Sequence, residues 1–484
     1  MAATTRRRFL QAAGASAALA ACGPVARPRS AAGPNVLVII VDTLRADHVF
    51  GDRARTPAMD QLMRAGISFT RTYPEAMPTV PARNSIFAGR RMFPFRGWRD
   101  GPGLLDSPGW SPPTDIDETF TSVLKRAGWW TGCVTDNPFV GYSAAYERLR
   151  RSFDLFEAKG GQLGRVRPLS SVSDQTFRHW LHPTLRKSPE IRLRVRKYMA
   201  NSRAWEDDAK SFAARVFREG AKALDRAAER RPFALVVDTY EPHEPWTPPR
   251  RFVNLYGDPD YRGAEPCMPR YMRTHRWLDE RQRGPVLGRM QNLYAAEVTM
   301  TDRWLGVFLE RLYDLGLERE TVIVLVGDHG ILIGEHGWTG KISVALHPAL
   351  AQVPLMIVDP QRRQAGVKRR YFASTHDIAP TILSMAGVPA PPSMTGNDLS
   401  AFFAGVRPPA RPFAYGGYAN SFFIRDDRWV LFGENEPANF KLYDLERDPG
   451  ENRNLAGRRP KLARELYRRV LERAGGPLPY FPNT

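Results

Sequence analysis

An aspartate and a histidine follow directly after one of the most apolar runs in this 484-residue chain. The run is VIVLV, residues 322–326, long enough for one buried β-strand and too short for a helix. Asp328 and His329 follow where such a strand opens into a loop, the edge at which open α/β sheets bind ligands. A carboxylate beside an imidazole suits a divalent cation. An ordinary polar turn has the same two residues, so the prediction of a metal site depends on partners elsewhere.

Two further strand patterns end in polar residues of the same kind. Residues 35–41 read NVLVIIV, and Asp42 follows at once. Residues 232–238 read PFALVVD and lead into TYEPHEP, which contains His243. Two buried strands that each deliver an aspartate to the sheet edge give a metal ligands from residues far apart in sequence. We therefore expect Asp42 and Asp328 to meet.

A hydroxyl and a guanidinium occur together at the start of a predicted helix. Residues 78–90 read PTVPARNSIFAGR, with Thr79 in the N-cap place and Gly89 able to close the helix. Arg83 lies four residues after Thr79, so its side chain can lean back toward the same helix end. A hydroxyl, an arginine and a positive helix terminus together favour an anionic substrate.

These blocks, in this order, resemble the sulfatase family of the alkaline phosphatase superfamily. The resemblance runs over most of residues 35–456 and rests on NVLVIIVDTLRADH, TVPARNSIFAGR, EPHEPW, GDHGILIGEHG…GK and LYDLERDPGENRNLA. It implies an α/β fold, an alkaline phosphatase-like mixed central sheet flanked by helices. The implied catalytic domain covers residues 35–400, and residues 401–484 form a small C-terminal α+β subdomain. Further helices are predicted over residues 119–128, 289–315 and 460–474.

The resemblance also implies a role for individual residues. Thr79 is the expected nucleophile, Arg83 steadies it, His243 protonates the leaving group and Lys341 neutralises developing charge. The expected metal ligands are Asp42, Thr79, Asp328 and His329.

One strand end departs from the family. Sulfatases usually carry a lysine and a histidine there to hold the sulfate, whereas this chain has Asp136, Asn137 and Pro138 after the strand predicted before them. Asn137 either binds an ester oxygen of the substrate or belongs to a structural turn.

Thr79 is itself a departure. Sulfatases have a cysteine or serine here that is converted to formylglycine, and the methyl group of threonine prevents that conversion, so we expect no formylglycine. Related family branches with a native threonine, such as phosphoethanolamine and glycerol-phosphate transferases, act on phosphoesters. Thr43 and His329 replace the second aspartate and the asparagine of calcium-binding sulfatases. Losing a carboxylate and gaining an imidazole shifts the expected ion from calcium toward manganese or zinc.

The prediction is therefore a metal-dependent hydrolase or transferase of phosphate or phosphonate esters. Cleavage of sulfate esters is the alternative enzyme function. A pseudoenzyme that only binds anions is a third hypothesis. The joint presence of a metal shell, His243 and Lys341 argues against it, since binding alone needs no leaving-group acid.

The first 22 residues predict an export signal. Arg6 and Arg7 lie in TRRRFLQ, which resembles a twin-arginine motif, and LAAC ends in Cys22 as in a bacterial lipoprotein box. We expect export to the periplasm or cell envelope and a lipid anchor on Cys22 in the bacterial membrane; a plain export signal is the alternative. Residues 23–34 then form a linker. No other stretch is long and apolar enough to span a bilayer.

The net charge of +19 is mostly due to arginine, since only ten of the 70 basic residues are lysine. No nucleic-acid-binding motif accompanies it, so we predict no nucleic-acid partner. Residues 138–232 are an Arg-rich, variable segment that is expected to carry the specificity loops for a small-molecule, lipid or polymer ester. Its charge runs are either solvated helix faces or a patch on anionic lipid. Cys133 and Cys267 either pair or stay as free thiols, and no sequence feature indicates an oligomeric state.

Overall fold

The computed structural model describes residues 33–113, 115–162 and 167–482, all within one compact unit. The predicted export signal, with Cys22, lies outside the described residues. Among those that are described, no helix has the length and apolar composition that crossing a membrane requires.

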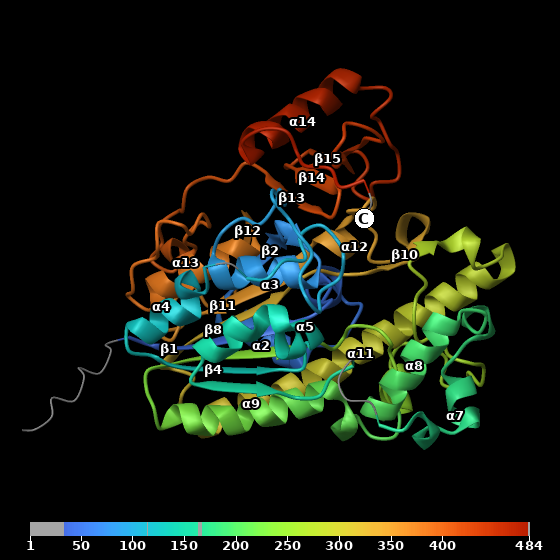
Figure 1. The fold of residues 1–484 in the computed structure, drawn as a ribbon, viewed down its shortest axis with the longest axis horizontal. Helices are drawn as coiled ribbons and strands as arrows, with labels where there is room; N and C mark the ends of the chain where they lie inside the picture. Colours follow the sequence, from blue (N-terminus) through green and yellow to red (C-terminus); the bar gives the residue numbers. More distant parts are fainter. Residues whose placement is uncertain (1–32, 114, 163–166, 483–484) are drawn as a thin grey trace, which may run out of the picture. The chain divides into compact units, whose positions relative to one another are not determined.

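A mixed eight-stranded sheet forms the centre of the fold (Figure 1). Its strand order is β12-β2-β11-β8-β1-β6-β4-β5. The bounds are β1 Asn35–Val41, β2 Ile67–Thr72, β4 Trp130–Thr135, β5 Leu155–Ala158, β6 Phe233–Thr239, β8 Thr321–Gly327, β11 Val353–Val358 and β12 Val367–Ala373. Strands β8, β1, β6, β4 and β5 run parallel, whereas β11 is antiparallel to both β8 and β2. The predicted mixed α/β sheet is confirmed.

Helices cover both faces of this sheet, which explains why β1, β6 and β8 are buried throughout. One face of β1, with Leu37 and Ile39, packs against α2 (Pro57–Ala65), α9 (Phe212–Ala228) and α11 (Glu280–Asp314). The other face, with Val36 and Val38, packs against α3 (Thr79–Ala88), α4 (Phe120–Arg126) and α13 (Ile378–Met385). Alternate residues of one strand therefore enter two separate cores.

Two helix starts differ from the prediction. Helix α11 begins at Glu280 rather than at residue 289, because Asp279 and Gln282 form a capping box that stabilises this earlier start. Helix α3 begins at Thr79 itself, with Pro78 in the cap position, so Thr79 is not the N-cap. Its hydroxyl is therefore free of capping. Gly89 ends α3 with φ of 61°, as its predicted closing role requires.

A second sheet of five strands has the order β16-β15-β14-β13-β3. Its strands are β3 Ala76–Met77, β13 Ala414–Tyr418, β14 Ser421–Arg425, β15 Trp429–Glu434 and β16 Lys441–Asp444. Helix α14 (Pro460–Ala474), which has the predicted bounds, packs on it through Leu466 and Val470. The edge strand β3 comes from the segment just before Thr79, so this sheet also supports the start of α3. A domain boundary at residue 400 stays a prediction.

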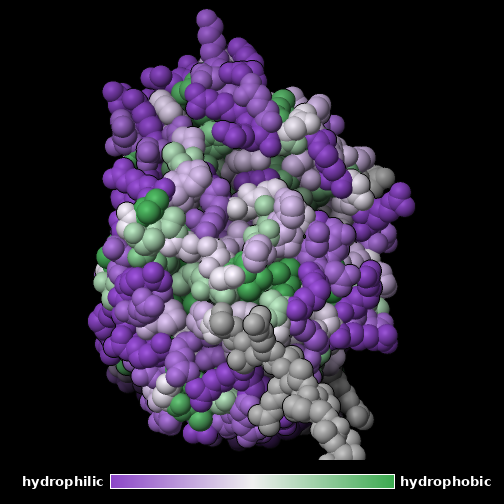
Figure 2. Space-filling model, turned by 90° about the vertical axis from the view of Figure 1, so that its left-hand side faces the viewer, coloured by the Kyte–Doolittle hydropathy of each residue, from purple (hydrophilic) through white to green (hydrophobic). Residues whose placement is uncertain are grey.

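The described part of the Arg-rich segment 138–232 consists mainly of helices, and four α-helices of that part precede α9: α5 Pro138–Tyr142, α6 Glu147–Ser152, α7 Asp174–His179 and α8 Pro189–Ser202. Hydrophilic residues cover most of the face in Figure 2, as expected when arginine is spread over the surface. Cys133 and Cys267 are both buried free thiols. They belong to different hydrophobic cores, and the Cys267 thiol donates to the carbonyl of Trp180 at 2.8 Å, so the alternative of a disulfide between them is wrong.

Candidate active site

The carboxyl ends of β1, β6 and β8 bring three aspartates together. In the parallel register Val41 lies beside Gly327, so Asp42 and Asp328 leave adjacent strands at the same level. Asp42, Asp328 and His329 offer ligand atoms within 4.8 Å of one another, and all three are buried. The structure thus brings together three of the four predicted metal ligands, as the strand patterns indicate.

Thr43 orients both metal-site carboxylates. Its backbone N–H donates to Oδ1 of Asp328 at 2.8 Å, and its hydroxyl donates to Oδ1 of Asp42 at 2.6 Å. Its φ of 59° lies in the left-handed region, which a β-branched residue seldom adopts. The hydroxyl of Tyr294 donates to the Thr43 carbonyl at 2.7 Å and so helps to hold this backbone in place.

The imidazole of His329 is fixed by its backbone. Nδ1 lies 2.9 Å from the carbonyl oxygen of Gly330, so Nδ1 carries the proton and donates it there. Nε2 therefore presents a lone pair toward Asp42 and Asp328, whose nearest oxygens are 3.8 and 3.4 Å away. Burial lowers the pKa of His329, which keeps the ring neutral and available as a ligand.

Thr79 is the fourth predicted ligand, and it completes this arrangement. Its hydroxyl oxygen lies 3.1 Å from Nε2 of His329. Arg83, one helical turn later, places Nη1 at 2.6 Å from Asp328 and 3.0 Å from Asp42, and Nη2 at 2.7 Å from Asp238. The same Nη1 donates to the Thr79 carbonyl at 3.2 Å. Arg83 therefore ties the start of α3 to three strand ends.

The charges of this cluster fit a bound cation. Three buried carboxylates face a single guanidinium, and Oδ2 of Asp42, although 3.0 Å from Nη1 of Arg83, accepts no hydrogen bond of good geometry from any described residue. Burial, and then the charge of Asp328, raise the pKa of Asp42 well above its ordinary value. A divalent ion relieves both costs. Two carboxylates, an imidazole and a hydroxyl form a ligand set that can hold a divalent metal ion.

A second group, around Lys341, lies near the first. The Lys341 ammonium lies 2.9 Å from each carboxylate oxygen of Glu244 and 2.9 Å from the Tyr271 hydroxyl, which itself donates to Glu244. Arg194 of α8 approaches Glu244 to 3.6 Å. The positive charge of Lys341 also acts to lower the pKa of Asp42, so its field reaches the metal site.

His243 belongs to this second group. Its Nδ1 lies 2.7 Å from the Glu244 carbonyl oxygen, and its ring stacks on Tyr240 with centroids 4.2 Å apart. Nδ1 thus carries the proton, and Nε2 is left for a ligand. Burial lowers the pKa of His243 well below its ordinary value, while the Glu244 carboxylate opposes that shift.

Asn137 has a structural role in this fold. Its Oδ1 accepts from the N–H groups of Phe139 and Val140, at 3.0 and 3.1 Å, and so caps helix α5. Only its Nδ2, which is buried and has no partner among the described residues, remains for an ester oxygen. The expected structural role of Asn137 in a turn therefore accounts for its Oδ1, whereas substrate binding through its Nδ2 stays a prediction.

Four residues that the sequence reasoning did not select line these two groups: Arg194, Asp238, Glu244 and Tyr271. For two of these residues the sequence contains a feature that could have identified them. Asp238 ends a buried strand as Asp42 does, and Glu244 adjoins His243 in the same turn. Arg194 and Tyr271 come from segments without a strand end or motif, so only the fold identifies them.

Comparison with known proteins gives matches over most of the chain. A sequence model described as Sulfatase matches residues 34–388, and one described as N-sulphoglucosamine sulphohydrolase, C-terminal, matches residues 334–473. The chain is 25% identical over 458 residues to an arylsulfatase of Clostridium perfringens, covering 87% of this chain and 90% of the relative. It is 25% identical over 451 residues to a choline-sulfatase of Rhizobium meliloti, covering 87% and 82%.

Solved structures confirm the predicted fold class. A phosphonate monoester hydrolase from Silicibacter pomeroyi superposes with a TM-score of 0.69 at 20% identity, covering 91% of this chain and 95% of the other. BT4656, solved with its substrate D-glucosamine-2-N,6-O-disulfate, gives a TM-score of 0.67 at 18% identity, covering 92% and 98%.

Proposed function

This chain belongs to the sulfatase family and is a sulfatase-like ester hydrolase, and we propose that it is metal-dependent and uses unmodified Thr79 as nucleophile on phosphate or phosphonate esters. The observation that carries the proposal is the position of the Thr79 hydroxyl, 3.1 Å from His329 and at the start of a helix tied by Arg83 to Asp42 and Asp328. A hydroxyl held among metal-type ligands is the arrangement that activates a weak nucleophile.

The residue type favours phosphorus over sulfur. Threonine carries a methyl group on the carbon that formylglycine formation would oxidise, so the chain must use the hydroxyl itself. Attack by that hydroxyl leaves an ester of Thr79 that water or a second alcohol must cleave. Phosphonate monoester hydrolases share the fold, and a relative 24% identical over 495 residues is described as a multifunctional alkaline phosphatase superfamily protein. Both support phosphorus esters as substrates.

Asp42, Asp328, His329 and Thr79 would hold the cation, which when bound lowers the pKa of a hydroxyl and withdraws charge from an ester oxygen. The Thr79 hydroxyl gives its proton to solvent water and forms a bond to phosphorus, while the bond from phosphorus to the leaving oxygen breaks. Arg83 holds α3, and therefore the hydroxyl, in line. Lys341 neutralises charge on the transferring group.

The leaving oxygen takes up a proton, and His243 is the residue proposed to deliver it. Because Nδ1 is bonded to the Glu244 carbonyl, the proton must come from Nε2 of the doubly protonated ring. Burial disfavours that form, and Glu244 favours it. Water or an alcohol then gives its proton to the neutral His243 and attacks phosphorus. The bond from phosphorus to the Thr79 oxygen breaks, and this oxygen takes up a proton from solvent water.

Sulfate ester cleavage is the second candidate function, and the arylsulfatase and choline-sulfatase relatives favour it. A binding protein without catalysis is the third hypothesis. Metal analysis combined with turnover of a nitrophenyl ester separates catalysis from binding. We expect one divalent ion per chain, turnover that a chelator abolishes, and recovery on adding manganese or zinc. A chain that holds metal but turns over no phosphate, phosphonate or sulfate ester would be a pseudoenzyme.

We further propose that the protein is exported and anchored by a lipid on Cys22, with a small-molecule, lipid or envelope-polymer ester as substrate. The support is the twin-arginine pattern followed by LAAC, which lies outside the described residues. The substitution Cys22→Ser should move the protein from the membrane fraction to the soluble fraction. Recovery of the variant with membranes, as for the unaltered chain, would contradict the anchor.

A further inference from the structure

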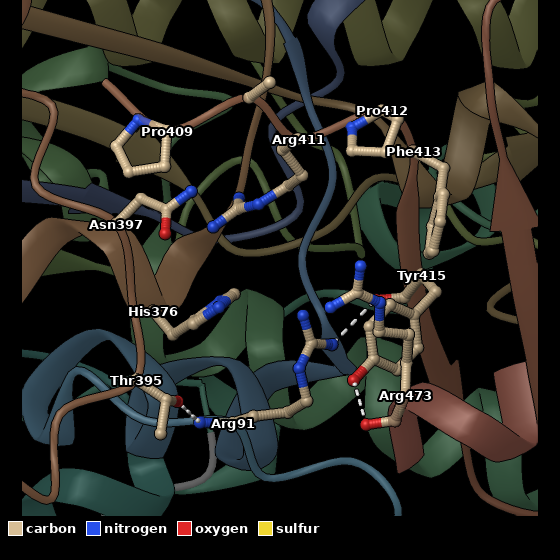
Figure 3. A pocket seen from close by; sticks show the side chains of 11 residues that line it. Arg91, His376, Thr395, Asn397, Pro409, Arg411, Pro412, Phe413, Tyr415 and Arg473 are labelled. Carbon is tan, nitrogen blue, oxygen red and sulfur yellow. Dashed lines mark hydrogen bonds between the residues drawn. The ribbon is translucent and has the colours of Figure 1, made fainter. Parts of the chain in front are cut away.

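A cavity of about 390 Å³ lies away from the candidate active site, and no residue of that site lines it. Figure 3 shows it between the segment that follows α3, the short helix Thr375–Asp377, strand β13 and the end of α14. Three arginines line it, Arg91, Arg411 and Arg473. Arg91 follows the end of the same helix that begins at Thr79, so the cavity lies at the opposite end of α3 from the nucleophile.

The three guanidinium groups are unequally neutralised. Arg411 forms a close double ion pair with Asp377, at 2.6 and 2.7 Å. Arg91 has its nearest carboxylate, Glu75, only at 3.8 Å, and its Nη1 donates instead to the Tyr415 carbonyl at 2.8 Å. Burial lowers the pKa of Arg91, and the charge of Glu75 does not offset it. The guanidinium of Arg91, which is half-buried and lies 3.8 Å from the centroid of the Tyr415 ring, therefore has no close carboxylate to compensate its charge.

Glu75 cannot approach Arg91 more closely without losing other bonds. Its two carboxylate oxygens accept from the backbone N–H groups of Met92 and Phe93, at 2.9 and 3.0 Å. Arg473 is exposed, and its guanidinium lies 5.7 Å from the Phe413 ring centroid without a carboxylate partner among the described residues. Three positive groups thus face two carboxylates, which leaves an excess positive charge in the cavity.

A buried imidazole with an unused nitrogen points into the same space. His376 is 2% exposed, and its Nδ1 has no hydrogen-bond partner among the described residues. Figure 3 shows its ring between Asn397 and Arg91, facing the cavity. Leaving such a nitrogen unpaired in a protein interior is costly, and when it carries the ring proton a ligand oxygen that accepts this proton is favoured. Thr395 accepts the Arg91 backbone N–H at 3.1 Å, which leaves its own hydroxyl proton to donate.

We propose that this cavity is a binding site for a tetrahedral oxyanion, a phosphate or sulfate group, held by Arg91, Arg473, His376 and Thr395. Guanidinium groups and neutral donors on several sides match the acceptor-only oxygens of such a group. Pro409, Pro412 and Phe413 form an apolar wall beside it, where the carbon skeleton of a sugar ester fits. The oxyanion therefore comes either as the free ion or on a sugar-sized ester.

The test is equilibrium dialysis of the full, metal-loaded chain against labelled inorganic phosphate, with Arg473→Gln as the variant. Arg464→Gln is the matched control, because Arg464 is an exposed arginine of the same helix and does not line the cavity. We expect two phosphates per unaltered chain, one at the candidate active site and one here. Arg473→Gln should weaken the second site by about tenfold, the effect of one charge-assisted bond, and Arg464→Gln should not.

Turnover of a nitrophenyl ester, measured in parallel, separates this site from the active site, since Arg473→Gln should leave kcat and KM unchanged. A chain without any turnover that still binds phosphate in an Arg473-dependent way would overturn the proposed function and not this inference. Equal binding by the two variants, or a single phosphate displaced by an active-site ligand, would overturn the inference.

A second arm compares inorganic phosphate and sulfate with glucose 6-phosphate. Tighter Arg473-dependent binding of the sugar ester would identify an ester-borne group as the ligand, and equal or tighter binding of the inorganic ions would identify the free oxyanion. If none of the three binds in an Arg473-dependent way, the proposed site is wrong.

Discussion

The hydroxyl oxygen of Thr79 lies 3.1 Å from Nε2 of His329, although 250 positions separate the two residues in the chain. The contact arises because β3 and Arg83 fix the start of α3 beside the end of β8. Since α3 begins at Thr79 itself, the hydroxyl does not occupy the cap position, and it contacts the imidazole of His329. This relationship is the basis of the proposed chemistry.

Replacing the nucleophile should abolish turnover without unfolding the chain. Thr79→Ala removes the hydroxyl, so we expect kcat/KM on nitrophenyl phosphate to fall by at least about 10³-fold. Thr79→Ser keeps a hydroxyl at the same place and should retain measurable turnover. Circular dichroism and thermal unfolding of both variants should resemble those of the unaltered chain. Turnover by Thr79→Ala close to that of the unaltered chain would remove Thr79 from the mechanism.

Removing one ligand carboxylate should weaken metal binding specifically. Asp42→Asn loses a charge from a buried set of three carboxylates, so we expect less than one metal ion per chain after dialysis and loss of turnover. Asp302→Asn is a suitable control, because Asp302 is also a buried aspartate but accepts from the backbone of Ala58 and Met59 at the start of α2. Equal metal content in the two variants would contradict the assigned ligand.

The role of His243 should depend on the leaving group. A nitrophenolate leaves without a proton, whereas an alkoxide needs one, so His243→Gln should slow alkyl esters by about 10²-fold or more and nitrophenyl esters far less. Similar losses on both ester types would contradict the assignment of His243 as the acid.

The same assignment predicts a direction of pH dependence. Because the pKa of His243 is lowered by burial, the doubly protonated ring becomes more populated as the pH falls through neutrality. The ratio of alkyl to nitrophenyl turnover should therefore rise from pH 8 to pH 6, and metal occupancy cancels in this ratio. His243→Gln should give a flat ratio. A pH-dependent ratio that persists in His243→Gln would indicate another acid.

Asp302 should make stability depend on pH. Burial raises its pKa to about 7 in the folded state. Between its unfolded pKa near 4 and that value, the folded state binds more protons than the unfolded state, so stability falls as the pH rises through this window. The substitution Asp302→Asn removes this pH-dependent contribution to the free energy of unfolding. We expect the variant to gain stability over the unaltered chain at pH 8 relative to pH 5, by about 2.6 kcal/mol, because about two of the three pH units between the two pKa values lie above pH 5. Denaturant titrations of both chains at pH 5 and pH 8 measure this difference in the free energy of unfolding. If the difference is the same at the two pH values, the raised pKa of Asp302 is contradicted.

The sequence predicted those parts of the site that depend on strands. Asp42 and Asp328 each follow a continuous apolar run, and parallel strands with buried runs deliver such residues to one edge. The ends of helices were predicted less well, because a cap depends on local backbone geometry that the pattern of apolar residues does not encode. Pro78 rather than Thr79 caps α3, and the capping box at Asp279 extends α11 beyond its apolar pattern.

The surroundings of Lys341 could not be predicted from the sequence. Glu244, Tyr271 and Arg194 reach it from three segments whose spacing in the chain has no period, and only the packed loops bring them together. The two cysteines illustrate the same limit, since their place in separate cores depends on which face of the sheet each segment covers.

The central claim is that unmodified Thr79 acts on phosphorus esters, and one assay tests it directly. The purified, manganese-loaded chain is given nitrophenyl phosphate, a nitrophenyl phosphonate and nitrophenyl sulfate side by side, together with Thr79→Ala. We predict that kcat/KM for the phosphorus esters exceeds that for the sulfate by at least about 10²-fold, roughly 3 kcal/mol of transition-state discrimination, and that Thr79→Ala abolishes it. Turnover dominated by the sulfate ester would contradict the claim.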